Sequence, residues 1–214
     1  PTPEAIAALK AKGCLLVTSA TSLREAEAAV ASGMDAVVAQ GFQAGGHRGV
    51  FDPAAADEQL GTLDLVTILA ARLDVPVIAA GGIMDGADIR AALEAGADAV
   101  QLGTAFVGCP ESAADEDYRA MLAQATGTAL TPAISGRPAR CLDNAFVAWA
   151  KTAGATVPGY PVTYDAGKAL IAAARAAGAP GFGAHWAGTG YARARPMPAA
   201  DLVALLAQEA GFDA

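Results

Sequence analysis

Cysteine is scarce in this 214-residue sequence. The three cysteines, Cys14, Cys109 and Cys141, lie far apart and form no C-x-x-C pair. An odd and scattered set excludes a disulfide framework, and no cluster of Cys, His and Asp has the spacing of metal ligands. We therefore expect no metal site and a protein of the reducing cytoplasm.

Basic residues are also few. Lysine and arginine together number 14 against 22 aspartates and glutamates, which gives a formal net charge of -8, and no basic run offsets it. This balance argues against a nucleic-acid partner, because binding to phosphate backbones needs concentrated positive charge. No uninterrupted apolar run reaches about 18 residues and no signal segment opens the chain, so we expect no membrane association.

Apolar residues make up 54% of the sequence, and they gather in short runs. Runs without polar alternation predict strands buried on both faces, and helical patterns separate these runs. The stretches SGMDAVVAQG and AGADAVQLGT repeat one helix-to-strand junction, with Asp35 and Asp98 as turn residues. Such alternation predicts an α/β fold with a parallel sheet. The expected strands are Cys14–Ser19, Ala36–Gln40, Val75–Ala80 and Ala99–Gly103.

Two helix starts are marked by their capping residues. Ser22 and Glu25 predict a capping box at the start of a helix that ends at Gly33. Asp85 or the glycine after it opens another helix, which ends at Gly96.

The pattern changes after Pro110, where we expect no further strand. Helices near residues 113–125, 141–153, 165–177 and 199–210 predict a helical lobe and a final helix that returns to the sheet. Four strands are too few for a closed barrel, which needs eight. The sequence therefore predicts the C-terminal half of a TIM (β/α)8 barrel, with the N-terminal half of the barrel missing from this chain. The expected boundaries are 1–110 for the barrel half, 111–190 for the lobe and 191–214 for the last helix.

Two glycine-containing turns end consecutive strands. Gly81 and Gly82 end one strand, and Gly103 and Thr104 follow the next. In α/β barrels, the loops after the last two strands form a phosphate site from backbone N–H groups and a helix N-terminus. A Cβ there would stand between the N–H groups and the phosphate oxygens. The pattern predicts a phosphate-bearing ligand, and the alternative is that these are ordinary turn glycines.

The loop AQGFQAGGHRG carries one of only two histidines in the chain. Gln40 ends the preceding strand, and Gly45 with its glycine neighbour lets the chain turn tightly before His47. Because histidine titrates near neutral pH, His47 is the candidate proton-transfer residue, with a structural histidine as the alternative. We expect Arg48 to be a solvated loop charge, with a ligand contact as the alternative, and His185 to be structural.

These stretches resemble the nitronate monooxygenase family, formerly called the 2-nitropropane dioxygenases. The family pattern A-Q-G-x-E-A-G-G-H-x-G, then A-A-G-G-I, then Q-x-G-T corresponds here to AQGFQAGGHRG, AAGGI and QLGT, and SGRPAR resembles its lobe. The resemblance covers nearly the whole chain and implies an FMN-binding (β/α)8 barrel with a helical lobe. The implied reaction oxidises an alkyl nitronate with O2, through FMN, to a carbonyl compound and nitrite.

The resemblance also implies roles for individual residues. His47 would face the substrate beside the flavin ring and would deprotonate a nitroalkane or hydrogen-bond a nitronate. The implied partners are a small-molecule nitronate or nitroalkane and O2, and a homodimer is compatible with the family. The implied FMN-binding residues are Gln40, Gly45, Gly81, Gly82, Gln101, Leu102, Gly103 and Thr104.

The match departs from the family pattern at two positions, and three rival readings stay open. Gln43 stands where the family commonly has Glu, and Thr189 stands where a Gln is common. Flavin-dependent enoyl-ACP reductases share the A-G-G-H loop and the G-G-I turn, and would use NAD(P)H to reduce a fatty-acyl double bond. The other rivals are a non-catalytic FMN- or phosphate-ligand-binding barrel and a structural half-barrel with no ligand. The last leaves both glycine turns unexplained.

Overall fold

A computed structural model describes residues 2–154 and 156–212. The chain divides into two compact units. Of these residues, unit 1 comprises 2–43, 49–102 and 207–212, and unit 2 comprises 44–48, 103–154 and 156–206.

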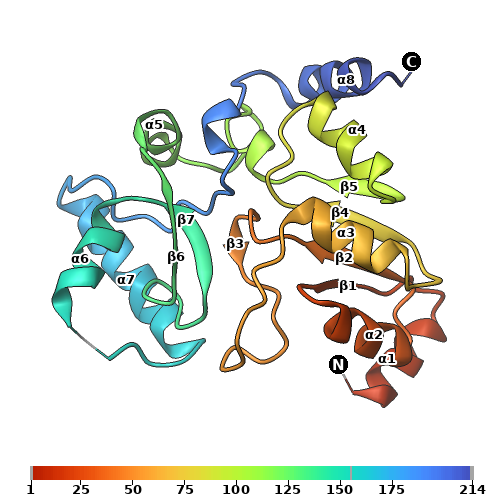
Figure 1. The fold of residues 1–214 in the computed structure, drawn as a ribbon. Coiled ribbons are helices and arrows are strands. Elements are labelled where there is room, and N and C mark those ends of the chain that lie inside the picture. The colour runs from red at the N-terminus through yellow and green to blue at the C-terminus, as the bar shows by residue number, and fades with distance from the viewer. Residues whose placement is uncertain (1, 155, 213–214) are drawn as a thin grey trace. The chain divides into compact units, whose positions relative to one another are not determined.

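Unit 1 is an α/β unit built on a four-stranded sheet, sheet A, with the strand order β1-β2-β4-β5 (Figure 1). Every neighbouring pair in sheet A is parallel, as the alternation of strands and helices predicts. All four expected strands are confirmed, each end lying within three residues of its predicted position. The elements are α1 Pro3–Lys10, β1 Val17–Ala20, α2 Leu23–Ala31, β2 Ala36–Gln40, α3 Thr62–Ala70, β4 Val77–Ala80, α4 Gly86–Glu94 and β5 Ala99–Gln101.

Side chains at the helix and strand ends explain why these elements begin where they do. Ser22 accepts a hydrogen bond from the Glu25 N–H at 3.3 Å, and Asp85 caps α4 in the same way. The capping box is only half formed, because the Glu25 carboxylate binds the backbone of Thr21 and not that of Ser22. The same carboxylate also accepts from the N–H of Phe51, so a buried acid ties the β1–α2 turn to a loop.

The two turn aspartates have the structural role expected of them. Asp35 accepts from the N–H of Leu16 at 2.8 Å, and Asp98 accepts from the N–H of Val77 at 2.8 Å. Each aspartate therefore fixes the start of the neighbouring strand, which explains why one junction sequence occurs twice.

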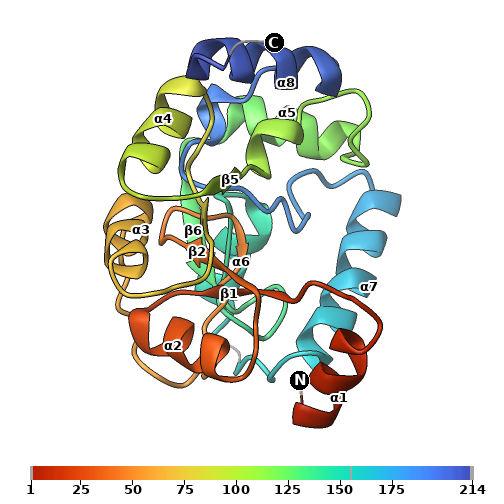
Figure 2. The same ribbon diagram turned by 90° about the vertical axis from the view of Figure 1, so that its right-hand side faces the viewer.

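Helices α2, α3 and α4 stand in a row along one face of sheet A (Figure 2). The two central strands, β2 and β4, are the most buried, whereas β1 and β5 have exposed positions because each has only one strand neighbour. Sheet A is open in the described residues, so no closed barrel is present in them. The core between sheet and helices includes Ala26, Ala29, Val37, Leu65, Val66, Leu69, Val77, Ala79, Ile89 and Ala92.

Unit 2 contains a three-stranded antiparallel sheet, sheet B, with the order β3-β7-β6. The prediction that no strand follows Pro110 is therefore wrong. The two strands after that proline are four residues long and contain polar residues, so they lack the long apolar run that marks a buried strand. The strands are β3 Gly46–His47, β6 Thr128–Thr131 and β7 Ala139–Leu142.

All four helices expected after Pro110 are present, although the one expected from residue 141 begins at Ala145 because Cys141 and Leu142 belong to β7. Ile134, Cys141, Phe146 and Val147 form one buried cluster, to which α7 adds Leu170. None of the helices in the described part of the chain combines the length and apolar character needed to cross a membrane. The helical elements are η1 Thr104–Phe106, α5 Glu116–Gln124, α6 Ala145–Ala153, α7 Val162–Ala176, η2 Tyr191–Arg193 and α8 Ala199–Ala210.

Candidate functional site

The register of sheet A brings the expected residues of unit 1 to one edge. Gln40 at the end of β2 lies opposite Ala80 of β4, and Ala80 lies opposite Gln101 of β5. Because these strands are parallel, the turns that begin at Gly81 and Leu102 lie at the same carboxyl edge. This is the edge at which ligands bind in open and barrel-shaped α/β sheets.

The turn after β4 needs glycine at both positions. Gly81 and Gly82 have φ angles of 123° and 74°, in the left-handed region that other residues rarely adopt. The Thr62 hydroxyl donates to the Gly81 carbonyl at 2.8 Å, and the Gln43 amide oxygen accepts from the Thr62 N–H at 2.9 Å. Gln43 thus covers the N-terminus of α3 and supports the turn through Thr62.

The loop after β2 is held by the side chain of Gln40. Its amide oxygen accepts from the N–H of Gly49 at 2.7 Å. Gly41 is constrained in another way, since a Cβ built there would lie 2.1 Å from the hydroxyl oxygen of Thr62. Glycine at position 41 is therefore needed for close packing.

In unit 2, Gly45 and Thr104, two of the expected flavin-binding residues, both lie against the backbone of Ala187 and Gly188. A Cβ at Gly45 would lie 2.5 Å from the carbonyl carbon of Ala187. The Thr104 hydroxyl oxygen accepts from the Gly188 N–H at 2.9 Å. Gly103, just before Thr104, is exposed, and no atom lies within 4 Å of the position its Cβ would take.

His47 lies in β3, where its backbone pairs with Ala139 of β7. Its Nε2 atom is 2.8 Å from the hydroxyl oxygen of Ser135, a fully buried residue. Burial lowers the pKa of the imidazole, and the positive charge of Arg137 lowers it further. The ring is therefore neutral at pH 7, the form in which histidine can accept a proton.

Three aromatic side chains surround the His47 ring. The ring centroids of Trp186, Tyr160 and Tyr164 lie 5.4, 5.8 and 6.0 Å from that of the histidine. The Lys168 ammonium lies 4.3 Å from the centroid of the Tyr164 ring. His47 is thus placed among aromatic side chains, and the Lys168 ammonium, which also lies 3.4 Å from the Asp165 carboxylate, stacks on one of them.

None of these neighbours of His47 was predicted from the sequence. Tyr164 and Lys168 are four residues apart on α7, a spacing that places two side chains on one helix face. Ser135 lies within the stretch SGRPAR, which resembles the family's lobe but by itself predicts no role for the serine. These were the only local signals, because the contacts join segments that are distant in sequence.

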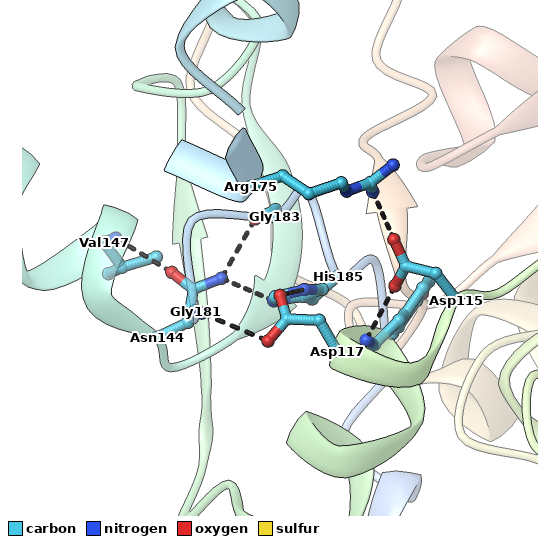
Figure 3. Close-up of polar contacts among 9 residues, drawn as sticks. Asp115, Asp117, Asn144, Val147, Arg175, Gly181, Gly183 and His185 are labelled. Carbon is cyan, nitrogen blue, oxygen red and sulfur yellow. Dashed lines mark hydrogen bonds and ion pairs between the residues drawn. The ribbon is translucent and has the colours of Figure 1, made fainter. Parts of the chain in front are cut away.

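A cavity of about 500 Å³ lies in unit 2. Tyr164 and Trp186, two of the aromatic residues around His47, form part of its wall. His185 lies at its wall and is 3% exposed. Figure 3 shows the His185 ring between the Asn144 amide, 3.0 Å from Nδ1, and the Asp117 carboxylate, 3.1 Å from Nε2. Both ring nitrogens are used within the fold, as expected for a structural histidine.

The expectation for Arg48 is wrong. Its side chain is 1% exposed, so it is not a solvated loop charge. The Arg48 N–H donates to the Pro138 carbonyl at 2.8 Å, which extends the β3–β7 pairing and draws the residue into the fold. A guanidinium removed from water needs hydrogen-bonding partners, so Arg48 belongs to the structural framework of the loop.

Comparisons with known proteins agree with the resemblance seen in the motifs. A family model described as nitronate monooxygenase matches residues 1–209. A protein named nitronate monooxygenase from Paraburkholderia phytofirmans is 56% identical over 212 residues, which cover 98% of this chain and 58% of that protein. The chain thus spans about three fifths of that relative's length.

Two solved structures are also similar. A nitroalkane oxidase from Streptomyces ansochromogenes has a TM-score of 0.91 and 42% identity, over 99% of this chain and 61% of the other. FabK from Thermotoga maritima has a TM-score of 0.78 and 28% identity, over 98% of this chain and 65% of the other.

Proposed function

This chain belongs to the nitronate monooxygenase family, and from that premise we propose that it acts with FMN to oxidise alkyl nitronates or nitroalkanes with O2 to carbonyl compounds and nitrite. The observation that carries the proposal is the setting of His47. A neutral imidazole stands among aromatic rings, in the loop whose sequence matches the family pattern.

The glycine turns fit the phosphate-bearing chain of FMN. Gly81 and Gly82 adopt backbone angles that would be strained for any residue with a Cβ, and the space beside Gly103 is open. Thr104 accepts a hydrogen bond from Gly188, so its own hydroxyl proton can be donated to a phosphate oxygen. We assign the phosphate and ribityl chain to these turns with Gln101 and Leu102, and further flavin contacts to Gln40 and Gly45.

When bound, FMN supplies the redox chemistry, so the protein itself moves few protons. His47 takes the proton from the carbon beside the nitro group of a neutral nitroalkane. With a nitronate, which is already ionised, His47 instead hydrogen-bonds the nitro oxygens. Tyr160 and Tyr164 flank the imidazole and are placed to contact the apolar part of the substrate, and Lys168, paired with Asp165, lies over the Tyr164 ring.

We further propose that sheet A is half of a (β/α)8 barrel, with the lobe at 111–190 and a returning helix at 191–214. The β/α alternation in unit 1 supports this assignment. A reducing cytoplasm suits the three free cysteines. The partners of this proposal are a small nitronate or nitroalkane and O2.

Replacing His47 with alanine tests the proton-transfer role. We expect the rate with a neutral nitroalkane to fall by roughly 10²- to 10⁴-fold, the usual contribution of a general base. The rate with the corresponding nitronate should fall much less, because that substrate needs no deprotonation. Flavin content, measured from the visible spectrum, provides the control for intact folding.

An equal loss with both substrates, at full flavin content, would show that His47 is not the base. The rival function is that of a flavin-dependent enoyl-ACP reductase. It predicts rapid NADH oxidation with an enoyl thioester, so that assay is run on the same preparation. Tight FMN binding with unchanged turnover in H47A would favour the non-catalytic binding protein.

A further inference from the structure

The hydrogen bonds of Ser135 determine which nitrogen of His47 carries a proton. A serine hydroxyl has one proton to donate, and its oxygen also accepts. The Ser135 oxygen lies 3.1 Å from the Arg137 carbonyl oxygen and 2.8 Å from the Nε2 atom of His47. A carbonyl can only accept, so the arrangement that satisfies both contacts has Ser135 donating to Arg137 and accepting from the Nε2–H of His47.

We propose that Ser135 is a positioning residue that holds His47 in the Nε2–H tautomer, which makes Nδ1 the atom that takes the substrate proton. The tautomer assignment follows from this chain's own contacts, whereas the role of Nδ1 as base rests on the proposed function. The opposite tautomer would turn the Ser135 hydroxyl toward Nε2 and deprive the Arg137 carbonyl of this donor. The buried Ser135 hydroxyl has a single proton, so it cannot donate to both the Arg137 carbonyl and Nε2 at once.

The arrangement is also unchanged by proton transfer. When Nδ1 takes a proton, both ring nitrogens become donors, and Nε2 continues to donate to Ser135. The Ser135 hydroxyl therefore does not need to rotate during the reaction. With the opposite tautomer, protonation at Nε2 would force that hydroxyl to turn away, which adds reorganisation to the transfer step.

The backbone around Ser135 is well placed to fix this geometry. Gly136 has a φ angle of 82°, its N–H donates to the Pro132 carbonyl at 2.7 Å, and a Cβ there would lie 2.5 Å from the Pro158 carbonyl oxygen. The backbone of His47 pairs with Ala139, four residues after Ser135. The imidazole and the hydroxyl are therefore held by one continuous segment and its paired strand.

Nitrogen NMR of the protein labelled with ¹⁵N only at histidine tests the assignment directly. Within this chain only His47 and His185 contribute, and a His47→Gln variant identifies the His47 signals by their loss. In the resting protein above pH 7 we expect the His47 Nε2 to carry the proton and Nδ1 to carry none. A proton on Nδ1 in the unmodified protein would overturn the proposal, whatever the activity.

Two Ser135 variants complete the test. In Ser135→Ala we expect both tautomers of His47 to be populated, and kcat with a nitroalkane to fall by roughly tenfold to a hundredfold, a part of the 10²- to 10⁴-fold that a general base contributes. KM should change little, since Ser135 is buried away from solvent. Ser135→Thr keeps the hydroxyl and should restore the single tautomer.

An S135A spectrum with the Nε2–H tautomer unchanged would refute the positioning role of Ser135. If the tautomer is as assigned but nitroalkanes are not consumed, the proposed function fails while the assignment stands. The NMR measurement therefore tests the tautomer assignment, and the kinetic measurement tests the proposed function, independently of each other.

Discussion

The Asn144 side chain makes three hydrogen bonds in unit 2, and its removal has consequences that can be worked out from them. The amide oxygen accepts from the Val147 N–H at 3.0 Å and so caps α6. The amide nitrogen therefore faces the Gly183 carbonyl and the Nδ1 atom of His185, each at 3.0 Å (Figure 3). Asn144→Ala removes all three bonds at once in a site that is 8% exposed.

The expected loss of stability is the sum of a capping effect and two unsatisfied acceptors. A lost N-cap costs about 1 kcal/mol, and each buried acceptor left without a donor costs roughly 1–3 kcal/mol. Partial relaxation lowers the sum, so we expect a destabilisation of about 3 kcal/mol. For a chain of this size that lowers Tm by roughly 6–12 °C, measured by far-ultraviolet circular dichroism.

Asn144→Asp is the matched comparison, because it keeps the cap and removes only the donor. Its second carboxylate oxygen would face the Nδ1 lone pair of His185, which is repulsive until that nitrogen is protonated. We therefore expect N144D to recover stability relative to N144A as the pH falls below about 6.5, the usual pKa of histidine. Parallel stability curves for the two variants, or a Tm of N144A within about 1 °C of the parent, would refute this account of the network.

Three further predictions follow from single contacts. Burial lowers the pKa of His185 despite the opposing effect of Asp117, so on acidification this histidine is protonated in the unfolded chain before it is protonated in the folded one. The stability that the neutral His185 contributes is therefore present above about pH 6.5 and is lost as the pH falls. Urea unfolding of His185→Asn should show a weaker dependence on acid pH. Gly41→Ala should lower the free energy of unfolding by more than about 3 kcal/mol, because its Cβ would lie 2.4 Å from the Thr62 Cα. Gly159→Ala is the matched control: no atom lies within 4 Å of its Cβ position, so the urea midpoint should stay nearly unchanged. Glu25→Gln should cost about 1–3 kcal/mol in the same assay, because an amide nitrogen would face a backbone N–H now bound by the carboxylate.

The features that could be predicted from the sequence are those set by neighbouring residues. The strand Ala36–Gln40 and the helix Ala199–Ala210 were predicted with their observed ends. Short apolar runs and capping side chains such as Ser22 act within a few residues, so they can be read directly. The repeated aspartate junction also located the starts of β1 and β4, although its hydrogen bonds span about 20 residues.

The features that could not be predicted depend on distant partners. Strand β3 consists of two residues, and it is a strand only because β7, about 90 residues later, pairs with it. The aromatic residues around His47 come from loop and helix positions beyond residue 159, so the sequence close to His47 does not predict them. Arg48 was judged by its charge, and its burial depends on packing that the local sequence does not describe.

The central claim, that this chain oxidises nitronates with FMN, is tested most directly by the visible spectrum of the purified, FMN-loaded protein under nitrogen. We predict that an alkyl nitronate bleaches the flavin, that air restores the colour, and that nitrite is released during turnover. A flavin that stays oxidised with nitronate but bleaches with NADH, or a protein that takes up no FMN, would contradict the account.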